Sequence, residues 1–189
     1  MSKLTLVLLV LGLLSLPLMA QDYPRVEVFG GYQYLYSGAN TVNGVSVPSQ
    51  NFNGWDAALT GKLTRDFGVE GDFGGAYATI SGVSNHVYTY TGGPIVSLST
   101  GMIRPFAHAL VGGIHLTSSE FGVSASQTGL TAMAGGGVDV RVDRAIALRL
   151  VQADWLYYRF GSQTVAGVTV PAYSQNNNVR VSTGIVLRF

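Results

Sequence analysis

Hydrophobic and polar side chains alternate along most of this chain with a period of two residues, which is the period of a β-strand. From residue 26 to residue 36, Val, Gly and Tyr occupy one face, whereas the other face includes Glu27 and Gln33. From residue 179 to residue 189, Val, Thr, Ile, Leu and Phe occupy every second position, and mostly Arg, Ser and Gly lie between them. The pattern predicts strands whose two faces meet different surroundings.

Eight segments carry this signal, and most of them are long for strands. They span residues 25–36, 54–63, 67–77, 86–96, 102–116, 127–141, 145–160 and 179–189. A strand in a globular protein averages about 5–6 residues, whereas a tilted strand that crosses a bilayer needs about 9–11. The segment lengths therefore favour membrane-spanning strands.

The connections between these segments alternate in length. Residues 64–66, 97–101 and 142–144 form tight polar turns, whereas 37–53, 78–85, 117–126 and 161–176 are longer and rich in Ser, Asn, Gly and Thr. This alternation is typical of an up-and-down barrel with one short-turn rim and one long-loop rim. We therefore predict an all-β fold, an eight-stranded antiparallel up-and-down transmembrane β-barrel, with both chain ends at the short-turn rim.

The N-terminus has the pattern of a secretory signal peptide. Lys3 precedes an apolar run over residues 4–14, and Pro17 then leads to Ala20. We expect residues 1–20 to be a cleaved signal peptide and residues 21–189 to be the barrel domain. A retained membrane anchor is the alternative, but the run is short and has no basic flank after it.

Composition narrows the classes of partner and site. Only 11% of residues are charged while 47% are hydrophobic, so disorder is excluded. Cleavage after Ala20 would remove Lys3 from 11 basic residues and leave ten against ten acidic ones, which argues against a nucleic-acid partner. There is no cysteine, so disulfides and thiol chemistry are excluded.

Several segments resemble the small eight-stranded barrels of the outer membrane protein β-barrel domain family, the OmpA/OmpX-like proteins. They are residues 26–32, 68–73, 104–112, 135–139 and 147–154 and the last strand, and together the resemblance spans residues 23–189. It implies an outer-membrane location, contact with outer-membrane lipid, and passage by periplasmic chaperones to the barrel-insertion machinery. In the family an alternating C-terminal strand ending in an aromatic residue is the insertion signal, and the matching residues here are Thr183, Ile185, Leu187 and Phe189.

Charged residues are rare and fall on the inferred inner face of the strands. They are Glu27, Asp56, Lys62, Glu70, Asp72, Asp139, Arg141, Arg149, Asp154, Arg180 and Arg188. The interior of an eight-stranded barrel is just wide enough for side chains. We therefore expect a lumen filled by paired charges rather than an open pore.

Aromatic residues cluster near the strand ends, which predicts two interfacial girdles. Next to the long loops lie Tyr34, Tyr36, Trp55, Tyr77, Tyr88, Trp155, Tyr157 and Tyr158. Near the short turns lie Phe67, Phe106 and Phe189.

Two strands do not fit a simple alternation. In 145–160, Arg149 has the opposite parity to Gln152 and Asp154, and a β-bulge between them would turn all three inward. In 102–116, Arg104 and His108 share a face with Phe106 and Leu110, so the orientation is ambiguous. We expect Phe106 and Leu110 to face lipid.

The first and last long loops contain a repeated sequence. Residues 41–48 read TVNGVSVP and residues 164–171 read TVAGVTVP, with six of eight positions identical. A Ser-Gln-Asn triplet follows each copy, at 49–51 and 174–176. Because the first and last strands pair to close the barrel, the repeats are expected to form neighbouring β-extensions that could contact an extracellular partner.

Candidate catalytic residues are few. His115, Ser118, Ser119 and Glu120 combine a base, hydroxyls and an acid, and His86 is expected close to His115. His108 and His115 have opposite parity, which does not favour a joint metal site. We therefore expect no catalytic centre, metal or cofactor, and a structural or surface-interaction role through the loops. A lipid-modifying enzyme and a soluble periplasmic ligand-binding barrel are the alternatives.

Overall fold

The computed structural model describes residues 24–42, 45–80, 82–98, 100–120, 123–165, 168–170 and 172–189. The predicted signal peptide lies outside this part of the chain. Within the described ranges, no helix is long and apolar enough to cross a membrane.

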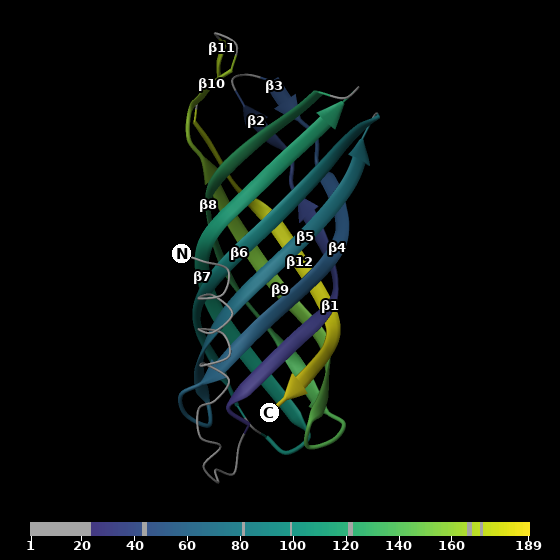
Figure 1. The fold of residues 1–189 in the computed structure, drawn as a ribbon, viewed down its shortest axis with the longest axis vertical. Helices are drawn as coiled ribbons and strands as arrows, with labels where there is room; N and C mark the ends of the chain where they lie inside the picture. Colours follow the sequence, from purple (N-terminus) through teal and green to yellow (C-terminus); the bar gives the residue numbers. More distant parts are fainter. Residues whose placement is uncertain are drawn as a thin grey trace, which may run out of the picture.

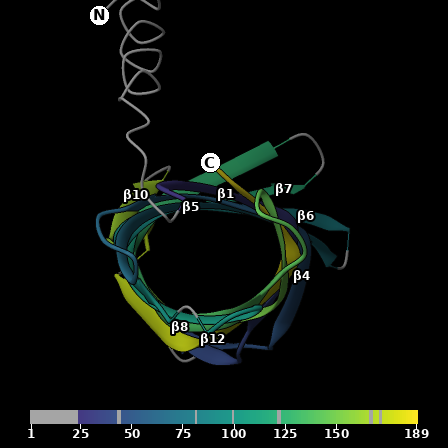
Figure 2. The same ribbon diagram turned by 90° about the horizontal axis from the view of Figure 1, so that it is seen from below.

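Eight long antiparallel strands close into a single barrel, which confirms the predicted fold class (Figures 1 and 2). They follow the order β1-β12-β9-β8-β7-β6-β5-β4, in which each strand pairs with its neighbour in sequence and β1 pairs with β12. Their bounds are β1 Val26–Ser37, β4 Gln50–Lys62, β5 Phe67–Ile80, β6 Val83–Ser97, β7 Ile103–Glu120, β8 Val123–Arg141, β9 Ile146–Phe160 and β12 Tyr173–Arg188.

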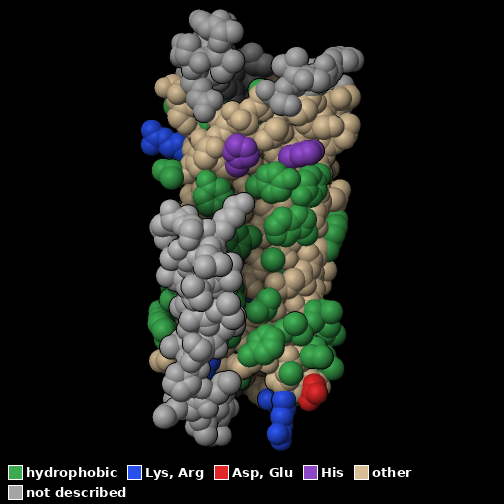
Figure 3. Space-filling model, viewed as in Figure 1, with side chains coloured by type: hydrophobic (Ala, Val, Ile, Leu, Met, Phe, Trp, Pro, Cys, Tyr) green, Lys and Arg blue, Asp and Glu red, His purple; other side chains and the backbone are tan. Residues whose placement is uncertain are grey.

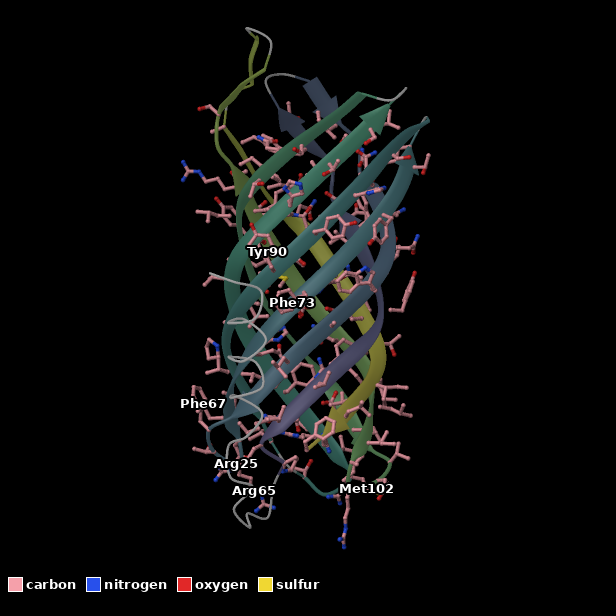
Figure 4. All side chains as sticks on the ribbon, in the orientation of Figure 1. Arg25, Arg65, Phe67, Phe73, Tyr90 and Met102 are labelled. Atoms are coloured by element: carbon pink, nitrogen blue, oxygen red, sulfur yellow. The ribbon has the colours of Figure 1, made fainter. Side chains whose placement is uncertain are left out.

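Short turns and both ends of the described chain lie at one end of the barrel, the turn end. The backbone N–H of Arg25 donates to the carbonyl of Phe189 at 2.8 Å, so the first and last strands begin and finish side by side. Arg25, Arg65 and Met102 mark this end in Figure 4. The opposite end, the loop end, carries the two longer connections.

Two segments predicted as loops are strands instead. Residues 78–80 and 83–85 continue the β5–β6 ladder up to the pair Ile80↔Val83, and the β7–β8 ladder continues to Glu120↔Val123. Gly82 takes up a positive φ of 86° at the β5–β6 turn. Polar composition was misleading here because strands that continue past the apolar band can be polar on both faces.

The predicted bulge in β9 is present. Val138 pairs with Val151 and Asp139 pairs with Arg149, so one residue of β9 has no partner on β8. Leu150 and Val151 are consequently both exposed, while Arg149, Gln152 and Asp154 are all buried. The bulge places three polar side chains from one strand in the lumen.

The expected orientation of Phe106 and Leu110 is wrong. Both side chains are buried inside the barrel, at 7% and 1% exposure. Arg104 and His108 share that face and bind interior carboxylates, and these ion pairs decide which way β7 presents its residues. Phe106 therefore does not belong to the turn-end girdle.

Candidate functional site in the lumen and at the loop end

The turn-end half of the lumen is filled by buried charged residues. Every predicted lumen charge except Arg141 is buried. In the part of the chain that the structure describes, the buried charged residues are Glu27, Asp56, Glu70, Asp72, Asp139 and Asp154 on the acidic side and Lys62, Arg104, Arg149, Arg180 and Arg188 on the basic side, with His108 between them.

Arg180 of β12 is the centre of this charged layer. Its Nη1 and Nη2 donate to the two carboxylate oxygens of Asp72 at 2.8 and 2.9 Å, and its Nε and Nη2 donate to Asp154 Oδ2 at 2.8 and 2.7 Å. Asp56 adds a third carboxylate at 3.4 Å. These partners come from β5, β9 and β4, so one guanidinium joins strands that are not all neighbours in the sheet. Bidentate pairing of this kind is the strongest form of carboxylate binding by arginine.

His108 of β7 makes a second connection across the lumen. Its Nδ1 lies 2.6 Å from Glu70 Oε1 and its Nε2 lies 2.8 Å from Asp154 Oδ1. Only an imidazolium can donate from both ring nitrogens at once. With that charge, the six buried acidic groups are balanced by five Lys and Arg and one His.

Arg149 links the charged layer to aromatic residues. Its Nε donates to Asp139 at 2.9 Å and its Nη1 donates to Gln152 at 2.6 Å. Its guanidinium carbon lies 4.3 Å from the ring centroid of Phe29 and 4.2 Å from that of Phe106. The side chain is thus held by hydrogen bonds at its edge and by cation–π contacts with two rings.

The turn end of the lumen has its own group of charges. Arg104 forms an ion pair with Glu27 and donates to Ser97 Oγ at 2.8 Å, and Arg188 lies 3.3 Å from the same glutamate. Lys62 donates to the same Ser97 hydroxyl. These contacts close the lumen at the turn end.

Arg141 is a correction to the predicted lumen set, because its side chain is exposed. It is the last residue of β8, at the rim, where side-chain parity no longer decides between lipid and lumen. Arg104 and His108 are the ionisable lumen residues that the predicted set did not include. Their shared parity was visible in the sequence, and two ionisable groups on one face are a stronger sign of a lumen face than two apolar groups are of a lipid face.

Toward the loop end the lumen becomes apolar, a change that alternation alone does not reveal. A buried cluster fills it there, made of Leu35, Phe52, Ala76, Val87, Leu110, Ile114, Met133, Leu156 and Phe160. Leu116, Tyr158 and Tyr173 pack against this cluster. The loop-end half of the lumen is therefore mainly apolar, whereas the turn-end half combines the charged layer with a smaller apolar cluster, Phe29, Ala58, Ala147 and Val186.

The outer surface carries the apolar residues that a soluble barrel would bury. Hydrophobic side chains spread over the visible face of the barrel, with Lys, Arg, Asp and Glu confined to positions toward its two ends (Figure 3). Phe67, Phe73 and Tyr90 lie at successive heights on this surface and are 41%, 53% and 47% exposed (Figure 4). An exterior with this many exposed hydrophobic side chains is favourable in lipid and unfavourable in water.

Most of the predicted girdle residues point outward, but Phe106 is buried inside the barrel and Tyr158 packs against the apolar cluster of the lumen. Tyr34, Tyr36, Trp55, Tyr77, Trp155 and Phe189 are exposed, and Tyr88 and Tyr157 are half-buried. Several are held by hydrogen bonds: Trp55 Nε1 donates to the Tyr77 hydroxyl at 3.0 Å and Tyr34 donates to Asn51 at 2.8 Å. Of the four residues predicted to form an insertion signal, Ile185, Leu187 and Phe189 are exposed on the same outer face, and Thr183 donates to the Arg149 carbonyl at 2.9 Å.

The two sequence repeats form two equivalent hairpins at the loop end (Figure 1). β2 Asn40–Val42 pairs with β3 Val45–Val47, and β10 Gln163–Val165 pairs with β11 Val168–Val170. The register is the same in both, with Thr41↔Ser46 matching Thr164↔Thr169. Asn40 also donates to the Ser174 carbonyl at 3.3 Å, which brings the first and last long loops together as predicted. Residues 43–44, 166–167 and 171 of the repeats lie outside the described residues.

Of the candidate catalytic residues, His115 and Ser118 do not come together. His115 lies on the outer face, where its Nδ1 is 2.8 Å from Thr128 Oγ1, whereas Ser118 has the opposite parity and donates to Asn85 at 2.7 Å. Tyr88 is the residue opposite His115, so His86 lies one diagonal step away. Among the described residues there is also no group of three His, Asp or Glu side chains arranged to hold a metal ion.

A polar lumen, an apolar exterior and eight closed strands define the fold class of small outer-membrane β-barrels. No family model matches the chain, and no curated protein matches its sequence. Solved structures do match its fold. Neisserial surface protein A superposes with a TM-score of 0.66 at 13% identity, covering 89% of this chain and 100% of that one. The attachment invasion locus protein Ail of Yersinia pestis gives 0.58 at 17%, covering 88% and 99%. OprG of Pseudomonas aeruginosa gives 0.54 at 9%, covering 90% and 98%.

Replacing Arg180 with Ala should destabilise the barrel strongly, because it leaves Asp72, Asp154 and Asp56 without their shared cation. Removing one partner of a buried ion pair costs about 3–5 kcal/mol. Urea unfolding in detergent micelles, followed by the heat-modifiable mobility shift on gels, measures this. Arg159→Ala removes an exposed arginine and should change stability by less than about 0.5 kcal/mol. Equal stability of the two variants would contradict the central role of Arg180.

The filled lumen should not conduct ions. Folded protein inserted into a planar bilayer should give no stable conductance steps above those of the same bilayer with detergent alone, because side chains occupy both halves of the lumen. Reproducible steps of fixed size from folded protein would contradict a closed lumen.

Proposed function

We propose that this protein is a small outer-membrane β-barrel with a filled lumen that acts as a structural or surface-interaction protein through its extracellular loops, 37–53 and 161–176. The single observation that carries this is the inverted polarity of the barrel, in which Arg180 and its carboxylates are inside while Phe73, Val111 and Leu130 are outside at high exposure. Lipid is the surrounding that stabilises this arrangement. The same exterior disfavours the soluble periplasmic alternative.

In this proposal the loop end faces the cell exterior and the turn end faces the periplasm. Short turns and paired chain ends are the periplasmic features of such barrels. The outer-face residues Ile185, Leu187 and Phe189 then form the insertion signal that the barrel-insertion machinery reads. Residues 1–20 serve as the cleavable export signal.

Deleting Phe189 should reduce insertion into the outer membrane severalfold, because it removes the exposed terminal aromatic of the signal. Membrane fractionation together with heat-modifiable mobility measures the folded, membrane-bound share. Phe67→Ala is a matched control, because it removes an exposed phenylalanine from the same end of the barrel without touching the C-terminal strand. Equal losses in both variants would mean that Phe189 acts only as one more apolar contact, and recovery of the intact protein in the soluble fraction would contradict the outer-membrane assignment.

The equivalent hairpins are the surface that we propose for contact with an extracellular partner. Each is a separate two-stranded sheet whose outer edges have no strand partner in the described chain. Thr41, Ser46 and Val47 are exposed. Unpaired strand edges can accept an extended segment from another protein by backbone hydrogen bonding.

Replacing residues 40–47 and 163–170 with short Gly-Ser turns should leave the barrel folded and lower adherence of cells that display it to a panel of immobilised matrix proteins. The barrel strands keep their own ladders, so heat-modifiable mobility should be unchanged. Replacing the two residues 81–82 of the β5–β6 turn with Asn-Gly, which keeps a two-residue turn at the same end of the barrel, is the control. Unchanged adherence after loss of both hairpins would contradict a hairpin-mediated contact.

A further inference from the structure

The loop end of the lumen contains a cavity of about 400 Å³ above the apolar cluster. Its floor includes Leu35, Phe52, Val87 and Ile114, all members of that cluster. Cavities that hold small organic molecules usually measure about 300–1,000 Å³ and are mostly apolar with a few polar groups. The volume of this cavity and its apolar floor agree with both of these properties.

One wall of the cavity is aromatic. The rings of Phe160 and Tyr173 lie 5.1 Å apart between centroids at an angle of 31°, and Tyr158 meets Phe160 edge to face at 5.5 Å. Tyr158 is fixed in place because its hydroxyl donates to Gln175 at 2.8 Å and lies 3.1 Å from Ser37 Oγ. The wall is therefore a preformed platform for a flat apolar group.

The polar groups around the cavity are neutral. Its described lining includes amides and hydroxyls such as Asn85, Gln127 and Ser37, but no Asp, Glu, Lys, Arg or His. The buried charged groups of the described residues lie deeper in the lumen and do not line this cavity. A charged ligand would thus lose its hydration without gaining a counter-ion.

The sequence repeat supplies this cavity with a pair of glutamines. The Ser-Gln-Asn triplet after each hairpin places Gln50 on β4 and Gln175 on β12, and both line the cavity on either side of β1. Gln175 is already engaged, since its Nε2 donates to Ser37 Oγ at 3.1 Å and to the Gly38 carbonyl at 2.6 Å. Gln50 is half-buried and forms no side-chain hydrogen bond among the described residues. It has both a donor and an acceptor to offer a ligand.

We propose that this loop-end cavity binds an uncharged small molecule that has a flat apolar body and one hydroxyl or N–H group. The body packs on the Phe160–Tyr173 wall and over the apolar floor, and the polar group pairs with Gln50. This function goes beyond surface interaction through the hairpins, because it uses the inside of the barrel mouth and needs no protein partner.

The test uses the folded protein in phospholipid nanodiscs, titrated with indole and with 4-methylphenol and followed by amide and methyl NMR. Both probes are neutral, flat and carry one N–H or O–H group. Saturable shift changes are expected at Ile114, Leu116 and Gln50. Indole-3-acetate, which keeps the ring and adds a negative charge, should bind at least tenfold more weakly.

Two variants locate the binding. Leu116→Trp fills the cavity from a half-buried lining position and should abolish the saturable shifts, whereas Leu130→Trp adds the same side chain on the outer face and should leave them unchanged. Gln50→Leu keeps the volume but removes the hydrogen bond, and should weaken binding about three- to tenfold. Heat-modifiable mobility shows that each variant is folded.

Shift changes that spread over outward-facing residues and persist in Leu116→Trp would mean that the probes only partition into lipid, and this would overturn the proposal. Absence of saturable changes with both probes would overturn it as well. Neither result bears on membrane insertion or on the hairpins, so the proposed function is tested separately.

Discussion

Lipid offers no partner to a charged side chain or to an unpaired backbone group, and this one constraint organises the whole barrel. It requires eight strands to close so that no edge remains, and it moves the charged side chains of the strands into a lumen about one side chain wide. Arg180 then faces three aspartates because no other space is open to any of them. Burial makes each of these groups costly alone, so removing one partner leaves the others uncompensated.

The charged layer also connects strands that the sheet leaves apart. Backbone ladders join each strand only to its two neighbours, whereas Arg180 reaches from β12 to β5 and His108 reaches from β7 to both β5 and β9. Backbone ladders fix the register of neighbouring strands but do not join opposite walls of the barrel. Cross-lumen ion pairs make that connection, and the bulge in β9 is what allows Arg149, Gln152 and Asp154 to take part from one strand.

Much of this architecture could be predicted from the sequence, because lipid forces a strict period of two. Strand number, order, antiparallel pairing, the bulge and the buried position of Asp56 or Glu70 all follow from that period. Side-chain parity no longer indicates whether a residue faces lipid or lumen where the strand leaves the lipid. At the rim, Arg141 is exposed despite its parity, and beyond the apolar band the polar residues of β7 and β8 continue as strand. Where one face of a strand carries both ionisable and apolar residues, as with Arg104 and Leu110, the rarer ionisable residue indicates that this face lies in the lumen.

The tight apolar packing of the loop-end half of the lumen is the part that the sequence could not reveal. Met133 shares its parity with Asp139, and Leu156 with Asp154, so alternation places both side chains inside, but only the structure shows that they pack against each other in one cluster. Ion pairs fix the arrangement of the side chains in the turn-end half of the lumen. In the loop-end half only the shapes of apolar side chains fix it, and a cavity remains at the mouth of the barrel. The repeated sequence adds a glutamine to that mouth from each side of β1. The part of the barrel farthest from the charged layer, where lipid no longer constrains either face, is therefore where the chain has most freedom to acquire a binding function.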